Sequence, residues 1–301
     1  MNCFNCNEFA YPRIIHSKIS IVPVGLDRSE DVQIALNECK NCGCITINNL
    51  DNNTRNLYIE DSTCFEASQQ TVVNNIYSYP YSSNLFSRKT IEKLERGRIC
   101  DFGCGAGFAT KILSDINPNT FGLDVDKESV KFATKNGLDV IYGDINTLQK
   151  SSFDHFISIG VLEHFQKPKE LLNLVTDKIR SNGGIIYLAF PNINAVTFKL
   201  SKFSKEPWDM LCEPGHYSLY SKTAIVNYFQ DKKFKLNSMR TTSHIGRGKN
   251  FLATFRSAEN EKKRMNKLVS SSLRRKIYKI IPQLLDKLKI GDIVIYEFEK
   301  I

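Results

Sequence analysis

The segment DFGCGAGF, which begins at Asp101, places an acidic residue next to three closely spaced glycines. Gly103, Gly105 and Gly107 permit a sharp backbone turn and leave no Cβ atom between the backbone and a ligand. Asp124 lies 23 positions after Asp101, at the end of the next strand-like run, where a carboxylate can accept both hydroxyl protons of a ribose. This spacing predicts a site for a ligand that contains a nucleoside.

Strand-like and helix-like segments alternate around these residues, with short connections between them. The expected strands are RICDFG, TFGLDV, LDVIYGD, FDHFISIG and GGIIYLAF, and the expected helices cover residues 108–116, 127–135, 168–180 and 222–230. Such alternation predicts parallel strands joined by right-handed crossovers, with helices on both faces. Two later strands, FKLNSMRTT and DIVIYEFEK, would add an antiparallel edge. We therefore expect an α/β fold, with a Rossmann-like, seven-stranded and mostly parallel sheet.

A third acidic residue makes the interpretation more specific than a glycine loop alone. Asp144 ends the third expected strand and could reach an adenine amino group. The main alternative is a dinucleotide-dependent oxidoreductase, whose GxGxxG fingerprint requires a glycine where this chain has Phe108. An ordinary nucleotide-binding fold with another ligand is a further alternative.

The motifs and their order resemble those of class I methyltransferases that use S-adenosylmethionine (SAM). The matching segments are DFGCGAG, GLDVD, GDI, FDHFISIGVLEHF and GGIIYLAFPN, and the resemblance covers roughly residues 85–245 and the last strand. It implies that SAM is the cofactor. By resemblance, the methionine part of SAM would face Asp101, Gly103, Cys104, Gly105 and Gly107, the ribose would face Asp124, and the adenine would face Asp144 and Ile145.

Two histidines are candidates for catalysis. Methyl transfer is an in-line displacement, and a hydroxyl or carbon acid that accepts the methyl group must lose a proton. His164 follows Glu163 after the fourth expected strand, and His216 lies in the irregular segment LCEPGHYSLYSK. We expect either one to act as the base. The alternatives are that the Glu-His pair supports the SAM pocket and that His216 orders its own loop.

The N-terminal region contains two Cys-x-x-Cys pairs. Cys3, Cys6, Cys39 and Cys42 would supply the four thiolates that tetrahedral Zn²⁺ prefers, with Cys44 as a substitute for Cys42. Four sulfur ligands leave no open position, so the zinc would be structural; buried thiols are the alternative. The expected domains are a β-rich, zinc-ribbon-like module over residues 1–64, a helical connector over 65–96 and the methyltransferase domain over 97–301.

A zinc ribbon followed by this domain resembles enzymes that methylate sugars in the biosynthesis of surface polysaccharides or deoxysugars. The sugar C-methyltransferases of that kind carry a further C-terminal domain, for which this chain is too short. We therefore expect O-methylation of a nucleotide-sugar or glycan. The alternatives are methylation of another small molecule or of RNA, and a SAM-binding module without catalysis.

A basic helical insertion is expected at about residues 246–290, where 13 Lys and Arg residues stand against 3 Asp and Glu residues. Such a helix can lie peripherally on an anionic membrane, or it can pack on the domain with solvated lysines. Few aromatic residues accompany the charges, which disfavours a nucleic-acid partner. The start of the chain shows no secretory signal pattern, so we expect a cytoplasmic protein. A homodimer is a further expectation.

Overall fold

A computed structural model describes residues 15–21, 30–48, 86–180, 183–201, 208, 210, 216–243 and 280–301. The predicted zinc ligands Cys3 and Cys6 lie outside the described residues, as do residues 65–85 of the predicted connector and residues 246–279 of the predicted insertion. Among the described residues, no helix combines the length and the apolar character needed to cross a membrane.

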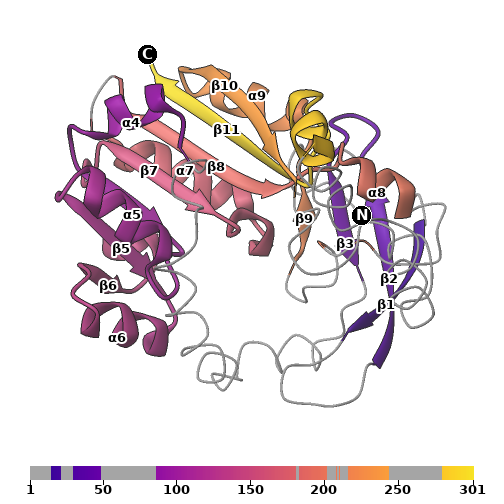
Figure 1. The fold of residues 1–301 in the computed structure, drawn as a ribbon, viewed down its shortest axis with the longest axis horizontal. Coiled ribbons are helices and arrows are strands. Elements are labelled where there is room, and N and C mark those ends of the chain that lie inside the picture. The colour runs from indigo at the N-terminus through magenta and orange to yellow at the C-terminus, as the bar shows by residue number, and fades with distance from the viewer. Residues whose placement is uncertain are drawn as a thin grey trace.

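The main element is a seven-stranded sheet, as the sequence predicted (Figure 1). Its strands, in spatial order, are β10 (Phe234–Thr242), β11 (Ile293–Lys300), β8 (Ile185–Pro191), β7 (His155–Ile159), β4 (Ile99–Phe102), β5 (Thr120–Asp124) and β6 (Val140–Tyr142). Strands β4 to β8 are parallel, whereas β11 runs antiparallel to both of its neighbours. Because β4 pairs with both β5 and β7, the strand order reverses at β4. Ligands of open α/β sheets bind in the crevice that forms at this switch point.

Helices cover both faces of this sheet. They are α4 (Arg88–Leu94), α5 (Phe108–Ile116), α6 (Lys127–Lys135), α7 (Pro168–Lys178) and α9 (Lys222–Asp231). Helix α8 (Val196–Ser201) instead contributes Phe198 to a separate core that includes Leu36, Ile45 and Leu219. Strand residues alternate between two cores: Phe156 and Leu188 belong to the core that includes α7 and α9, whereas Ile157 and Tyr187 belong to the core that includes α4 and α5. This alternation follows from the two-residue period of a strand that is buried on both faces.

The boundaries of several helices follow from their capping residues. Asp126 accepts a hydrogen bond from the Ser129 N–H at the start of α6, and Ser221 accepts one from the Ala224 N–H at the start of α9. Pro168 occupies the first turn of α7, where its missing N–H costs nothing. Helix α8 was not predicted.

A second, four-stranded sheet contains the N-terminal strands β1 (Ile15–Ile21), β2 (Glu30–Glu38) and β3 (Ile45–Asn48). Its fourth strand, β9 (Ser218–Leu219), comes from the later part of the chain and pairs antiparallel with β3. Figure 1 shows this sheet on the side of the molecule away from β5 and β6. The β-rich character of the N-terminal module was predicted; its sharing of a sheet with residues 218–219 was not.

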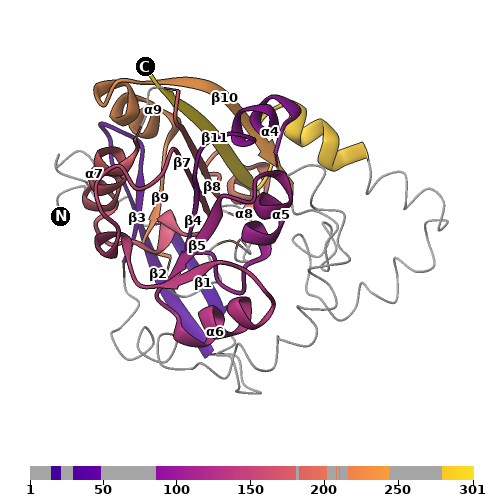
Figure 2. The ribbon, with the colours of Figure 1, turned by 90° about the vertical axis from the view of Figure 1, so that its left-hand side faces the viewer.

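Residues 280–287 form a helix that precedes β11 and lies at the margin of the described fold (Figure 2). It is the part of the predicted basic insertion that the structure describes. Ile280, Leu284 and Leu288 recur at helical spacing and are each more than half exposed. Residues 280–287 are thus helical within the segment where a basic helix was expected, and the rest of that prediction stays a prediction.

Candidate cofactor and acceptor site

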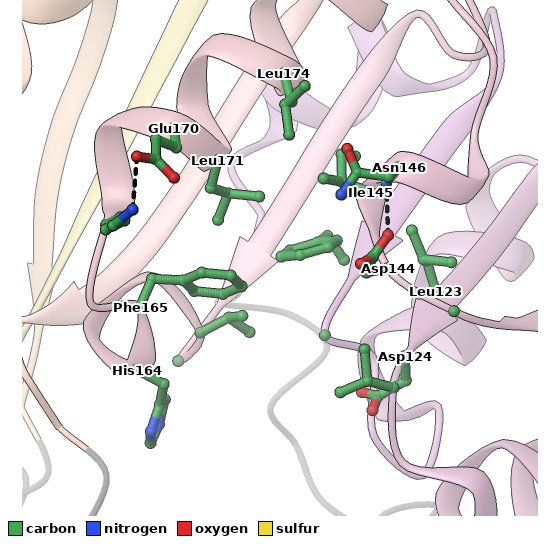
Figure 3. A pocket seen from close by; sticks show the side chains of 17 residues that line it. Leu123, Asp124, Asp144, Ile145, Asn146, His164, Phe165, Glu170, Leu171 and Leu174 are labelled. Atoms are coloured by element: carbon green, nitrogen blue, oxygen red, sulfur yellow. Dashed lines mark hydrogen bonds and ion pairs between the residues drawn. The ribbon is translucent and has the colours of Figure 1, made fainter.

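A cavity of about 680 Å³ opens at the carboxyl ends of the parallel strands (Figure 3). Its lining comes from the loops after β4, β5, β6 and β7 and from the start of α7. The lining residues are Phe102, Gly103, Leu123, Asp124, Val125, Gly143, Asp144, Ile145, Asn146, Gly160, Val161, His164, Phe165, Lys167, Glu170, Leu171 and Leu174. The volume suits a nucleoside-sized ligand.

The glycine loop between β4 and α5 has the backbone that its sequence predicted. Gly103, Gly105 and Gly107 have φ values of 68°, 50° and 86°, in the left-handed region that favours glycine. A Cβ atom at position 103 would overlap the side chain of Val161, and one at position 107 would overlap Leu138. The loop can therefore pack this tightly only with glycine at those two positions.

Asp124 ends β5, lines the cavity and is held by two backbone groups. The Gly105 N–H donates to its Oδ2 at 2.7 Å, and the Asp126 N–H donates to its Oδ1 at 2.8 Å. These bonds fix the orientation of the carboxylate against the glycine loop. Each oxygen retains a second lone-pair direction, so the group can accept further hydrogen bonds from a pair of ligand hydroxyls.

The next strand end supplies a second acid and an apolar surface. Asp144 follows β6 and caps a short 3₁₀ helix, η1 (Ile145–Thr147), by accepting a hydrogen bond from the Asn146 N–H at 2.7 Å. The side chain of Ile145 is buried and lines the same cavity. An acceptor beside an apolar wall suits a planar base that carries an amino group.

Asp101 lies behind the cavity lining and is buried. Its carboxylate accepts a hydrogen bond from the Thr110 hydroxyl at 2.6 Å, which ties the end of β4 to α5. Burial raises the pKa of Asp101 to about 6, with the Thr110 hydrogen bond opposing the shift and the charge of Asp124 adding to it. In this structure Asp101 therefore supports the loop, and its predicted contact with the methionine part of SAM remains a prediction.

Cys104 also lies behind the lining. It is buried, and a Cβ atom at Gly122 would lie only 2.6 Å from its sulfur, so the thiol packs directly against β5. Burial raises the pKa of the Cys104 thiol well above its usual range, and Cys100, fully buried in β4, is shifted in the same direction for the same reason. The structure thus places Gly103, Asp124, Asp144 and Ile145 on the lining of the cavity, whereas Asp101, Cys104, Gly105 and Gly107 are not among the lining residues.

The two candidate catalytic histidines lie next to each other. His164 ends a second 3₁₀ helix, η2 (Leu162–His164), and lines the cavity on the side opposite Asp124 and Asp144 (Figure 3). Its ring centroid is 4.5 Å from that of His216, in an edge-on arrangement. The sequence identified each histidine separately, but it contained no signal for their contact across 52 positions.

His216 is buried, and its tautomer follows from its partner. Its Nδ1 lies 2.7 Å from the Met210 carbonyl oxygen, which can only accept, so Nδ1 carries the hydrogen and Nε2 keeps a lone pair. Burial, followed by the neighbouring His164, lowers the pKa of His216 to about 4. The ring is therefore neutral near pH 7 and can accept a proton or bind a metal through Nε2.

Glu163 completes this group. Its carboxylate, His164 and His216 each place one ligand atom so that all three atoms lie within 4.8 Å of one another. Two hydrogen bonds hold the elements together: the Tyr217 N–H donates to the Glu163 carbonyl at 2.8 Å, and the Tyr220 hydroxyl donates to the Leu162 carbonyl at 2.7 Å. Of the residues that the structure describes, this is the one group arranged to hold a metal ion.

The predicted zinc ligands Cys39 and Cys42 lie in the tight turn between β2 and β3. The Cys39 N–H donates to the Cys44 carbonyl at 2.8 Å, and Gly43 adopts a positive φ of 70° within the turn. Cys39 and Cys44 are buried in the main core, and the Cys42 carbonyl accepts a hydrogen bond from the Ser221 hydroxyl. The turn therefore packs on the start of α9, with Cys42 half-buried.

Comparison with known protein families identifies a match for this chain. A family model described as "Methyltransferase domain" matches residues 82–238, which is more than half of the chain. The crystal structure of a SAM dependent methyltransferase from Archaeoglobus fulgidus has a similar fold, with a TM-score of 0.51 and 16% identity over 78% of this chain and 99% of that chain.

Curated relatives match over shorter segments. The ubiquinone biosynthesis O-methyltransferase of Xanthomonas euvesicatoria is 26% identical over 44% of this chain and 59% of its own length. A mitochondrial protein of the same name from Schizosaccharomyces pombe is 26% identical over 30% of this chain and 36% of its own length. A probable tRNA methyltransferase 9B from Bos taurus is 30% identical over 36% of this chain and 26% of its own length. The chain thus spans less than two thirds of the length of these relatives.

Proposed function

Because the chain belongs to the methyltransferase-domain family, we propose that it binds SAM in the 680 Å³ cavity and transfers the methyl group of SAM to an acceptor. The observation that carries this proposal is the position of Asp124. Two backbone N–H groups orient its carboxylate at the end of β5, next to the switch point at β4, and Asp124 lines the cavity. A ribose needs such a bidentate acceptor for its two hydroxyls.

The cofactor would lie across the carboxyl ends of β4, β5 and β6. In this arrangement Asp124 accepts the ribose hydroxyls, and Asp144 with Ile145 contacts the adenine. The methionine part extends along the loop at Gly103 toward His164. The methyl group would then lie between the cofactor half of the cavity and the half bounded by His164, Phe165 and Leu171, which we assign to the acceptor.

We propose a hydroxyl oxygen as the methylated atom and a sugar-containing molecule, either a nucleotide-sugar or a glycan, as the acceptor. The names of the ubiquinone O-methyltransferases support transfer to oxygen. The choice of a sugar as acceptor rests on a different argument: the predicted N-terminal module resembles that of enzymes that methylate sugars. Another small molecule is the alternative acceptor, and RNA is a second one because a probable tRNA methyltransferase is among the relatives.

A structural zinc ion bound by Cys3, Cys6, Cys39 and Cys42 remains part of the proposal. Cys39 and Cys42 lie three positions apart in one tight turn, which brings two of the four ligands to one end of β2. A cytoplasmic location and a peripheral membrane contact through the basic segment also remain proposals. The exposed Ile280, Leu284 and Leu288 are consistent with such a contact.

The test is calorimetric titration of the full chain with SAM and with S-adenosylhomocysteine. Wild type should bind both, and Asp124→Asn should bind about 10- to 100-fold more weakly, because the loss of a charge-assisted hydrogen bond costs about 1.5–3 kcal/mol. Asp115→Asn is the matched control, since Asp115 is exposed on α5 and pairs with Lys111. Absence of binding by folded wild type, or equal affinities in the two variants, would refute the proposal. Transfer of labelled methyl groups to nucleotide-sugars, glycans and RNA would then identify the acceptor.

A further inference from the structure

We propose that Glu163, His164 and His216 bind a divalent first-row transition-metal ion at the acceptor end of the cavity. The metal site itself does not depend on methyl transfer. Its use for the acceptor, described below, rests on the proposed function. In the proposed site the two imidazoles and one carboxylate are the protein ligands, and the acceptor approaches the remaining positions from the cavity.

The geometry of the three side chains supports this assignment. One potential ligand atom from each residue lies within 4.8 Å of the other two, so small side-chain rotations bring all three onto one ion. His216 lies 53 positions after Glu163 and 52 after His164, so folding brings the third ligand to the other two. The hydrogen bond between the Tyr217 N–H and the Glu163 carbonyl fixes the two segments side by side.

The surroundings of His216 match those of a metal ligand. A histidine that binds a metal through one ring nitrogen almost always donates from the other nitrogen to a carbonyl or carboxylate. The Nδ1 of His216 makes such a bond to the Met210 carbonyl, which leaves Nε2 as the ligand atom. The nearly buried carboxylate of Glu163 supplies a negative charge that offsets part of the charge of a cation.

The ligand types indicate which ions can bind. Imidazole nitrogen suits Zn²⁺, Fe²⁺, Co²⁺ and related ions, whereas Ca²⁺ and Mg²⁺ prefer oxygen ligands alone. Two histidines and one glutamate are also the ligand set of metal sites that keep a position open for water or substrate. This distinguishes the site from the predicted four-cysteine zinc site, which would be closed.

The open side of the site faces the acceptor. His164 lines the cavity, whereas Glu163 and His216 lie behind it, so a bound ion would be reached from the cavity past His164 (Figure 3). A hydroxyl of the acceptor that binds the ion loses its proton to solvent more readily. The acceptor oxygen then forms a bond with the methyl carbon of SAM. The bond between this carbon and sulfur breaks, and the electron pair of the broken bond remains on the sulfur of S-adenosylhomocysteine. An acceptor with two neighbouring oxygens would fit an ion with two open positions.

Titration with Co²⁺ tests the site in the full chain after dialysis against a mild chelator, which empties the proposed histidine site and leaves zinc at the proposed four-cysteine site. Co²⁺ reports its ligands in its absorption spectrum. We expect d–d bands without the thiolate charge-transfer bands that cysteine ligands would add. Glu163→Gln and His216→Gln should each weaken Co²⁺ binding at least tenfold. Glu170→Gln is the matched control: Glu170 is a second glutamate beside the cavity, it pairs with Lys167, and its loss should leave Co²⁺ affinity within threefold of wild type.

Two further measurements keep the result interpretable. His164→Gln removes an exposed ligand, so it reports on the site if the buried His216→Gln variant does not fold. Affinity for S-adenosylhomocysteine should stay within threefold of wild type in the folded Glu163→Gln and His216→Gln variants, because these two residues do not line the cavity. A wild type that gives no nitrogen- and oxygen-ligated Co²⁺ spectrum, or variants that bind Co²⁺ as wild type does, would overturn the metal site. Co²⁺ binding without S-adenosylhomocysteine binding would keep the metal site and refute the methyltransferase proposal instead.

Discussion

Two glycines with similar backbones allow the cofactor loop to be tested separately from the fold. Gly105, in the loop between β4 and α5, has φ 50°, and Gly137, after α6, has φ 80°. A Cβ atom added at either position would meet no described residue within 4 Å. Neither glycine is itself a lining residue of the cavity, but Gly105 donates its N–H to Asp124, which lines it.

The expected magnitudes follow from this comparison. An alanine in the left-handed region costs about 1–2 kcal/mol, so Gly105→Ala and Gly137→Ala should lower the free energy of unfolding by similar amounts. Only Gly105→Ala adds a methyl group to the space between the loop and the proposed cofactor. Inserting a methyl group into a packed contact costs about 1–3 kcal/mol, which corresponds to roughly 5- to 150-fold weaker binding.

Thermal unfolding and calorimetric titration with S-adenosylhomocysteine measure the two effects. The melting temperatures of the two variants should fall by a similar few degrees. The affinity of Gly137→Ala should stay within threefold of wild type, and that of Gly105→Ala should fall at least fivefold. Equal affinities in two folded variants would refute the placement of the cofactor against this loop.

Three further perturbations test other parts of the structure. The pKa of Asp101 in the folded protein, about 6, lies above the ordinary value of 3.8, so wild type loses stability as the pH rises from 4 through 6. Asp101→Asn should therefore raise the free energy of unfolding at pH 7.5 by up to about 3 kcal/mol, and with it the melting temperature. This gain should vanish near pH 4. Gly103→Ala should lower the melting temperature more than Gly137→Ala, and Val161→Ala should partly restore it, because the added Cβ atom overlaps the Val161 side chain; no restoration would contradict the steric explanation. Ser221→Ala should cost about 1–2 kcal/mol in denaturant unfolding, since it removes both the cap of α9 and the bond to the Cys42 carbonyl; an unchanged midpoint would show that neither bond stabilises the fold.

Much of the seven-stranded sheet could be predicted because its signals are local. The predicted bounds of α5 and α6 coincide with the observed ones, and α9 differs by a single residue. The glycine turn determines where α5 begins, and Asp126 and Ser221 supply side-chain caps to the other two helices. The alternation of strands and helices then leaves few topologies, and these have parallel strands joined by right-handed crossovers.

The second sheet could not be predicted in the same way. Strand β9 has two residues, too few to show a periodic pattern, and its partner β3 lies more than 160 positions earlier in the chain. The burial of Cys39 and Cys44 in the main core likewise depends on this long-range pairing. The cofactor half of the site could be predicted as the main sheet could, because its acidic residues Asp124 and Asp144 stand at the ends of consecutive strands. The acceptor half depends on the contact between His164 and His216, which no local pattern contains.

The two halves of the site are therefore held by different parts of the chain. Asp124 and Asp144 are positioned by β5, β6 and the glycine loop, all within the family match. His216 directly precedes Tyr217, whose N–H donates to the Glu163 carbonyl and whose carbonyl accepts from the Ile47 N–H of β3 at 2.9 Å. Since Tyr217 links the N-terminal sheet to the 3₁₀ helix η2, the N-terminal strands help to position the acceptor side of the cavity. Sequence changes in those strands would then alter acceptor use while leaving the cofactor contacts intact, which is a physical reason for a small β-rich module to accompany a methyltransferase domain.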